Sequence, residues 1–167
     1  MGFGEKWRKW IHCCVEFARF SVLVNGSATG YFKNEKGISK GDPISPFLFL
    51  LVGEFLTSMI KKSQEKGLVS GFQSKEGGMM VIHLQFADDT LIFPDADEEQ
   101  VKNLRLILIS FEMLTRLKFN FAKIQIFGVG YEGDLSVFSS LLGCYSGVLP
   151  TSYLGLPLGD KCRGIDK

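Results

Sequence analysis

Hydrophobic positions follow a helical period in three separate stretches of the chain. In the first, over residues 4–18, Trp7, Trp10, Cys14 and Phe17 recur at intervals of three and four. Charged side chains occupy the positions between them, so this stretch has one apolar side and one polar side. The pattern predicts an amphipathic helix.

The second helical stretch is apolar on most of its sides. Ser45 can cap its start, and Pro46 suits the first helical position. We expect the helix to run to about Lys66, with Gly67 as its stop signal. A helix without a continuous polar side is usually buried, so we expect this one in the core.

The third helical stretch has acidic residues at its start. Asp97 is the predicted cap, and the helix should run from Glu98 to about Arg116. Carboxylates in a first turn are favoured by the partial positive charge of a helix N-terminus. The predicted inner face consists of Val101, Leu104, Leu108 and Phe111.

Stretches rich in β-branched and aromatic residues alternate with these helices. The Asn25-Gly26 pair in "FSVLVNGSATGYF" favours a type I′ turn and predicts a hairpin. Residues 68–82 are glycine-rich and predict a loop or a weak strand pair. "HLQFADDTLIF" predicts strand, turn and strand, and Leu117 to Phe121 alternate as a strand does. The tail, with "SYLGLPLG", predicts turns and short strands.

Length and composition are typical of a folded α+β chain. The 167 residues are 46% hydrophobic and 22% charged, which suits one domain or a large part of one. The four cysteines form no CxxC pair, and the two histidines complete no zinc pattern. We therefore expect reduced thiols in an intracellular protein of the cytoplasm or nucleus.

No targeting or membrane segment is apparent in the sequence. Charged residues interrupt the first apolar positions, so no signal peptide is predicted. The longest apolar run, Phe47 to Leu56, contains Glu54 and is too short to span a bilayer. We therefore expect no membrane partner.

Charge is distributed unevenly, although the formal net charge is only +1. Residues 1–40 are mainly basic, whereas residues 88–99 contain six acidic residues and no basic one. Such a distribution suits a polyanion held by metal ions. It also suits ordinary solvated charge.

Asp88 and Asp89 stand side by side in the predicted turn of "LQFADDTLIF". Their repulsion is relieved by a divalent cation, and Mg²⁺ prefers carboxylate oxygens while keeping positions open for phosphate. Two such ions about 4 Å apart can activate an attacking oxygen and stabilise a leaving one. The simpler interpretation is a polar turn, because Asp is common in turns. A calcium-binding loop over 95–100 is disfavoured, because Glu99 and Gln100 break its pattern.

Several motifs follow one another in a specific order: "GISKGDPISPFLF", "FADD", "LKFNFAK" and "YLGLPLG". Together they resemble the reverse-transcriptase family, and in particular the non-LTR (LINE-type) retrotransposon polymerases common in plants. The resemblance implies an incomplete polymerase palm, that is, a ferredoxin-like βαββαβ core lacking its first strand, with an antiparallel sheet backed by helices. The palm core would span about 36–130. Residues 1–35 would be a helix and hairpin insertion, and 131–167 would lead to the thumb.

The resemblance also assigns roles to particular residues. Asp88 and Asp89 would bind two Mg²⁺ ions, with Mn²⁺ as an alternative, and carry nucleotidyl transfer. The residues implied to contact the incoming nucleotide or the template are Lys40, Gly41, Ser45, Pro46 and Lys123. The implied partners are an RNA template, a DNA primer and deoxynucleoside triphosphates.

The sequence departs from the family pattern in three places. Lys40 stands where the family has Gln, so a group that donates and accepts is replaced by a cationic donor. Thr115-Arg116 replaces the usual Ser-Gly. A third aspartate, which the family carries on a strand before the "MGFG" region, has no counterpart in the 167 residues.

These departures leave three functional hypotheses. The first is an RNA-directed DNA polymerase by descent that does not polymerise as this chain alone. The second is a non-catalytic retroelement remnant that binds nucleic acid or has no activity. The third, a phosphoacceptor domain, would need a doubly wound parallel sheet and is disfavoured by the hairpin signals. In the first case the hairpin would rely on its helices and on a strand from 117–127.

Overall fold

The computed structural model describes residues 2–33, 41–73 and 77–159. It divides into two compact units, Met1–Leu51 and Val52–Lys167, each of which is described by itself. Among the described residues, no helix combines the length and apolar character needed to cross a bilayer. Lys40 lies outside the described residues.

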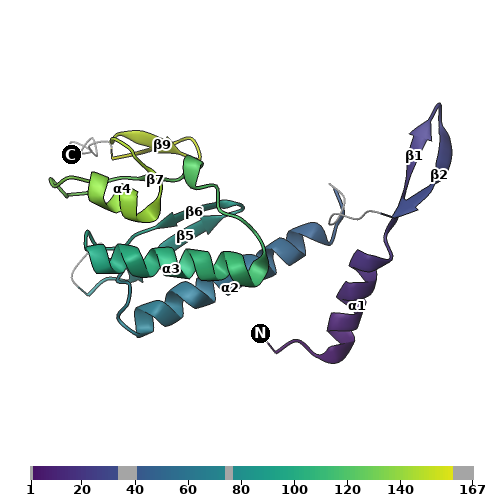
Figure 1. The fold of residues 1–167 in the computed structure, drawn as a ribbon, viewed down its shortest axis with the longest axis horizontal. Helices are drawn as coiled ribbons and strands as arrows, with labels where there is room; N and C mark the ends of the chain where they lie inside the picture. The colour runs from purple at the N-terminus through teal and green to yellow at the C-terminus, as the bar shows by residue number, and fades with distance from the viewer. Residues whose placement is uncertain (1, 34–40, 74–76, 160–167) are drawn as a thin grey trace, which may run out of the picture. The chain divides into compact units, whose positions relative to one another are not determined.

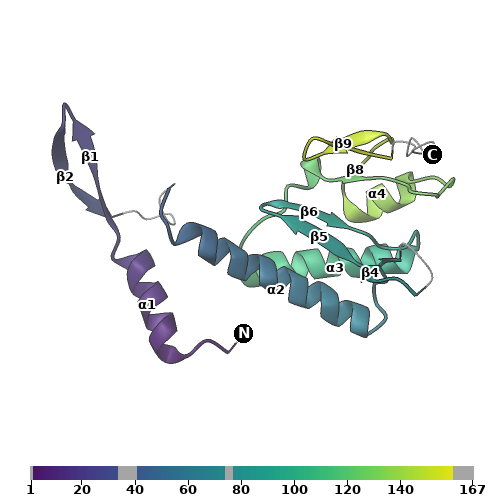
Figure 2. The same cartoon turned by 180° about the vertical axis from the view of Figure 1, so that it is seen from behind.

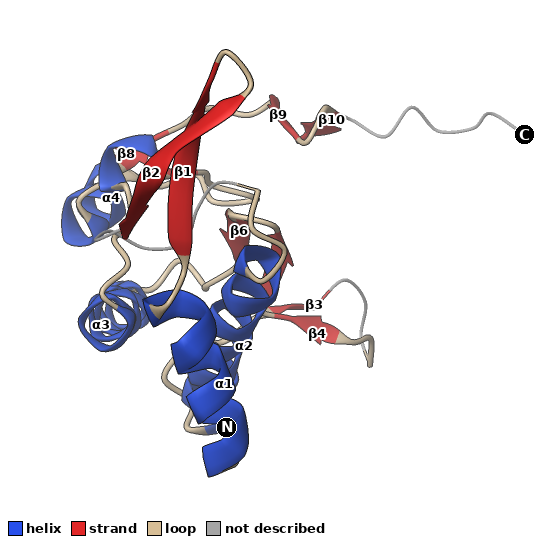
Figure 3. Ribbon diagram, turned by 90° about the vertical axis from the view of Figure 1, so that its right-hand side faces the viewer, coloured by secondary structure: helices blue, strands red, loops and turns tan. Residues whose placement is uncertain are grey.

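The first unit confirms the predicted helix and hairpin. It contains α1 (Glu5–Glu16), β1 (Arg19–Val24) and β2 (Ser27–Lys33). The two strands pair antiparallel and form a twisted ribbon (Figure 3). The turn between them has φ values of 50° at Asn25 and 82° at Gly26, as a type I′ turn requires.

Helix α2 (Ser45–Glu65) begins one residue earlier than its predicted first position. The prediction that Ser45 caps the helix is wrong, because Ser45 is already helical. The side chain that stabilises the turn before the helix is that of Asp42, whose Oδ1 accepts a hydrogen bond from the backbone N–H of Ile44 at 2.9 Å. A carboxylate two residues upstream therefore fixes the turn into the helix.

The other end of α2 confirms Gly67 as the stop signal. Gly67 has φ +69°, its N–H donates to the Gln64 carbonyl at 2.8 Å, and the Leu68 N–H donates to the Ser63 carbonyl at 2.9 Å. These two bonds form a Schellman motif, which favours glycine at this position.

Burial of α2 is uneven along its length. The residues that it buries are Gly53, Leu56 and Ile60. Phe47 and Leu50, nearer its start, are exposed, so the expectation of a wholly buried helix is wrong.

The second unit places a hairpin beside two helices. Its first elements after α2 are β3 (Phe72–Gln73), β4 (Met80–Val81), β5 (His83–Phe86), β6 (Asp89–Ile92) and α3 (Glu98–Thr115). Figures 1 and 2 both show β5 and β6 beside α2 and α3. The mixture of helices and small antiparallel sheets confirms the α+β class, and the β3–β4 pair confirms the weak strand pair.

Helix α3 contributes more buried residues to the core of this unit than any other element in the described part of the chain. Asp97 caps it as predicted, with its Oδ1 accepting from the Gln100 N–H at 3.0 Å. The buried residues of α3 are Val101, Leu104, Ile107, Leu108 and Phe111, which include the predicted inner face. They form one cluster with buried side chains of α2 and α4, so the core lies between these helices.

The last part of the chain contains small elements. They are η1 (Phe121–Lys123), β7 (Gln125–Ile126), α4 (Ser136–Leu142), β8 (Tyr145–Ser146), β9 (Thr151–Tyr153) and β10 (Leu156–Leu158). The β9–β10 hairpin confirms the predicted short strands, whereas α4 was not predicted. Strands β7 and β8 pair in parallel, so the pairing is not antiparallel throughout.

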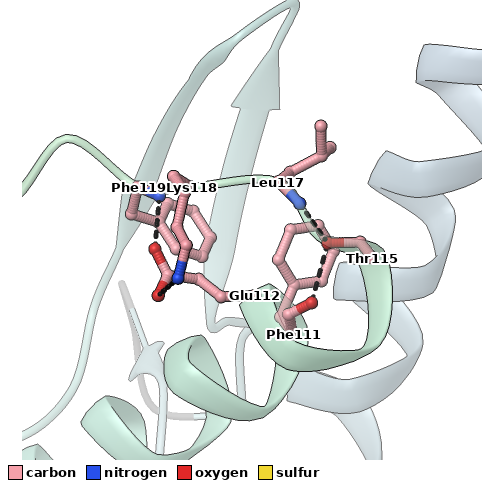
Figure 4. A network of polar contacts seen from close by, with 6 residues as sticks. All are labelled: Phe111, Glu112, Thr115, Leu117, Lys118 and Phe119. Atoms are coloured by element: carbon pink, nitrogen blue, oxygen red, sulfur yellow. Dashed lines mark hydrogen bonds and ion pairs between the residues drawn. The ribbon is translucent and has the colours of Figure 1, made fainter.

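The predicted strand from Leu117 to Phe121 is wrong. In the described part of the chain every sheet has two strands, and none adds a third strand to β5–β6. Arg116, the C-cap of α3, has φ +60°, and the Thr115 hydroxyl accepts from the Leu117 N–H at 3.2 Å (Figure 4). The chain therefore leaves α3 in a left-handed turn.

A carboxylate then holds the segment after this turn. Glu112 Oε1 accepts from the Phe119 N–H at 2.7 Å, and Glu112 Oε2 lies 3.4 Å from Lys118 Nζ. The Phe119 ring packs on that of Phe111, with ring centroids 5.4 Å apart. Side-chain contacts to α3 thus take the place of the strand pairing that the alternating pattern predicted.

Candidate functional site

The tip of the β5–β6 hairpin presents the acidic pair. Phe86 pairs with Asp89 across the strands, so Ala87 and Asp88 form the turn and Asp89 begins β6. Both aspartates are exposed. Ala87 has φ +50°, a left-handed conformation that costs an L-residue about 1–2 kcal/mol. The prediction of strand, turn and strand is confirmed, with Asp88 in the turn and Asp89 as the first residue of β6.

Each face of this hairpin has a different environment. One face carries His83 and Gln85 of β5, together with their partners across the strands on β6. The opposite face carries Leu84, which is 51% exposed, and Phe86, which is 63% exposed. Asp89 shares this second face, because it pairs directly with Phe86.

Helix α2 contacts the first face at two places. Thr57 Oγ1 lies 3.0 Å from His83 Nε2. One turn earlier, a Cβ placed on Gly53 would lie 2.7 Å from the Gln85 amide nitrogen, so this glycine permits the close contact. Burial, followed by the positive charge of Lys61, lowers the pKa of His83 below its ordinary value, while Glu54 acts in the opposite direction.

The roles of Gly53, Thr57 and His83 in this contact were not predicted from the sequence. One signal was available for Gly53, because a glycine inside a helix costs about 1 kcal/mol relative to alanine and so stands out in a helical pattern. Nothing in the sequence pairs Thr57 with His83, since 26 positions separate them.

The residues predicted to contact nucleotide or template fall in both units. Gly41 has φ +91°, so its backbone conformation alone favours glycine. Ser45 and Pro46 are the first two residues of α2, and these three residues belong to the first unit. Lys123 belongs to the second unit, at the end of η1, and is exposed. Within the described ranges, no ion pair joins Lys123 to Asp88 or Asp89.

The acidic pair suits a hard cation in the kind of donor that it offers. Mg²⁺ is commonly held by one or two carboxylates plus waters and substrate phosphates, and Asp88 and Asp89 are two exposed carboxylates on neighbouring residues. No group of three or more His, Cys, Asp or Glu residues gathers as a metal site in residues 2–33, 41–73 or 77–159. Two carboxylates are the number of protein ligands that such a magnesium site commonly uses.

Comparison with known proteins extends this picture. The family described as reverse transcriptase (RNA-dependent DNA polymerase) matches residues 1–158. An uncharacterized mitochondrial protein of Arabidopsis thaliana is 37% identical over 68 residues, which cover 41% of this chain and 56% of that protein. A retrovirus-related Pol polyprotein from the type-1 retrotransposable element R2 of Popillia japonica is 27% identical over 96 residues, 58% of this chain. That match covers 15% of the polyprotein, so the chain aligns with only part of each relative.

Proposed function

The chain belongs to the reverse transcriptase (RNA-dependent DNA polymerase) family, and from this premise we propose that it is palm sequence of a retrotransposon polymerase. The observation that carries the proposal is the exposed Asp88-Asp89 pair at the tip of a hairpin that rests on α2. The resemblance read from the motifs is confirmed by the family match. The similarity to a Pol polyprotein from a type-1 retrotransposable element supports the retrotransposon assignment.

The order of elements supports a palm core. Helix α2, strands β5 and β6, and helix α3 occur in the order of the central αββα of a βαββαβ unit, with the short β3–β4 pair inserted between α2 and β5. We assign the palm core to about 36–130, the helix and hairpin of 1–35 to an insertion, and 131–167 to the region leading toward the thumb. In this assignment a further strand would pair with a free edge of the β5–β6 hairpin.

Asp88 and Asp89 are proposed to bind divalent metal, Mg²⁺ or Mn²⁺. Members of this family generally use divalent metals, which when bound activate a primer hydroxyl and stabilise the departing pyrophosphate oxygen. The two carboxylates would hold the cations at the exposed turn. The hairpin turn would hold the two carboxylates at the exposed tip. The positive φ of Ala87 makes this turn conformationally unfavourable, and that strain is the energetic cost of the arrangement.

The remaining assigned residues would contact the substrates. An RNA template, a DNA primer and deoxynucleoside triphosphates follow from the family. Lys40, Gly41, Ser45 and Pro46 are proposed to lie along nucleotide or template, with Lys123 directed at phosphate. Because Lys40 replaces Gln, we expect it to contact phosphate by charge.

Metal binding by the 167-residue chain tests the central assignment. Isothermal titration with Mn²⁺ should show binding that Asp88→Asn and Asp89→Asn each abolish. Glu99→Gln, an exposed acidic residue on α3, is the matched control and should bind as the parent does. Equal binding by all four proteins would remove the metal-site proposal.

Primer extension separates the polymerase from the non-catalytic alternative. We propose that this chain alone does not extend a primer on RNA, because the third aspartate that the family resemblance implies has no counterpart in the 167 residues. Extension that disappears in Asp88→Ala would overturn this statement. Filter binding over a salt series would then distinguish a nucleic-acid-binding remnant, whose affinity falls steeply with salt, from one without binding.

A further inference from the structure

Helix α2 and strand β5 meet through two residue pairs with matched spacing. Gly53 and Thr57 are four residues apart, one helical turn, and so lie on the same side of α2. Their partners, Gln85 and His83, are two residues apart and lie on the same face of β5. The helix therefore contacts the strand over two successive positions, immediately before the turn that carries Asp88.

The Thr57 contact is the only hydrogen bond that the His83 ring makes within the described residues. His83 Nε2 lies 3.0 Å from Thr57 Oγ1, and His83 Nδ1 is buried without a hydrogen-bond partner in that part of the chain. A ring held through one nitrogen depends on that hydroxyl for its orientation. Loss of the hydroxyl would free the ring and loosen the strand at this point.

The Gly53 contact sets how closely the helix approaches the strand. Gly53 is buried, and the Gln85 amide group occupies the space that a side chain on Gly53 would need. A single methyl group would displace only the flexible end of Gln85. A longer side chain would press on β5 itself, so the effect of substitution should grow with size.

We propose that Thr57 and His83 are positioning residues that orient the β5–β6 hairpin on α2 and thereby place Asp88 and Asp89, with Gly53 setting the spacing. The proposal rests on the proposed function, because metal binding is the purpose assigned to the two aspartates. Thr57 and His83 need not contact metal or substrate, because they affect Asp88 and Asp89 only through the position of strand β5.

Two readouts on the 167-residue chain test the proposal. The first is the NMR signals of the Asp88 and Asp89 amides and carboxyl carbons, which require no metal. The second is Mn²⁺ affinity. Thr57→Val should shift these signals and weaken Mn²⁺ binding several-fold, whereas Thr57→Ser, which keeps the hydroxyl, should resemble the parent. Ser58→Ala, on the exposed side of α2, is the control and should change neither readout.

A size series at Gly53 tests the spacing separately. Gly53→Ala should change both readouts slightly and Gly53→Leu strongly, and Gln85→Ala should restore part of the loss in Gly53→Leu. If Gly53→Leu does not fold, recovery of the fold by Gln85→Ala still supports the contact, and no recovery overturns it.

The outcomes separate this proposal from the metal assignment. Unchanged Asp88 and Asp89 signals in a folded Thr57→Val variant overturn the positioning role, whatever the metal data show. Shifted signals in a parent chain that binds no Mn²⁺ would uphold the positioning role and refute the metal site. Equal weakening by Thr57→Ser and Thr57→Val would show that the hydroxyl does not matter and would also overturn the proposal.

Discussion

The β1–β2 and β5–β6 hairpins, the two longest among the described residues, are stabilised in different ways. The β1–β2 hairpin turns at Asn25-Gly26, where positive φ angles are favourable, and every residue of β2 is exposed. The β5–β6 hairpin turns at Ala87-Asp88, where the positive φ of Ala87 is unfavourable, but one of its faces rests on α2. The first hairpin has a turn of favourable local chemistry, whereas the second has an unfavourable turn and tertiary contacts with α2.

This difference has a functional meaning under the proposed assignment. Asn-Gly is a sequence that favours a two-residue hairpin turn, and the first hairpin has it at its tip. The second hairpin instead places two carboxylates and an alanine there, and so departs from local preference where we assign the chemistry. Contacts with α2 stabilise the β5–β6 hairpin and so compensate for its unfavourable turn.

The largest expected effect comes from removing that support. Ile60 of α2 is fully buried, and Ile60→Ala should lower the free energy of unfolding of the second unit by about 2–5 kcal/mol. Amide hydrogen exchange should then speed up in β5 and β6 and remain unchanged in β1 and β2. Ser58→Ala on the same helix is the control. Equal acceleration in both hairpins would refute the distinction between them.

Exchanging the turn residues tests the comparison at the tips. Gly26→Ala should destabilise the first hairpin by about 1 kcal/mol, because φ is +82° and no atom near the new Cβ compensates. Ala87→Gly should stabilise the second hairpin by about 0.5–1 kcal/mol, since relief of the left-handed strain exceeds the added chain entropy. Urea denaturation of both variants measures the two effects. Shifts of the same sign would show that turn conformation does not distinguish the hairpins.

Prediction from sequence succeeded where a structure depends on neighbouring residues. The Asn25-Gly26 turn, the Asp97 cap and the Gly67 stop each rest on a side chain or backbone preference within a few positions. The acidic tip was found in the same way, because "FADD" lies between two β-prone runs.

Prediction failed where distant contacts decide the conformation. Leu117 to Phe121 alternate like a strand, but the hydrogen bond from Phe119 to Glu112 holds this segment against α3. The Gly53 and Thr57 contacts to β5 join residues far apart in the chain, so no local pattern reports them. Helix α4 has seven residues, too few for a clear helical period.

The smallest expected effect is a pH dependence confined to the second hairpin. Burial and the positive charge of Lys61 lower the pKa of His83, while Glu54 opposes them, so the folded chain binds this proton less readily than the unfolded chain. The contribution of His83 to stability is therefore fully present above its ordinary pKa of about 6.5 and is lost as pH falls through the lower folded pKa.

Replacing the titrating group should remove this dependence. In His83→Gln, exchange of the β5 and β6 amides, corrected for its intrinsic pH dependence, should respond less to acid than in the parent. The β1–β2 amides should respond alike in both proteins. His12→Gln, an exposed histidine on α1, is the matched control and should leave the response of β5 and β6 unchanged. If acid still speeds up amide exchange in β5 and β6 of His83→Gln as much as in the parent, other titrating groups cause the effect. Protonation of His83 would then not weaken the contact between the hairpin and α2.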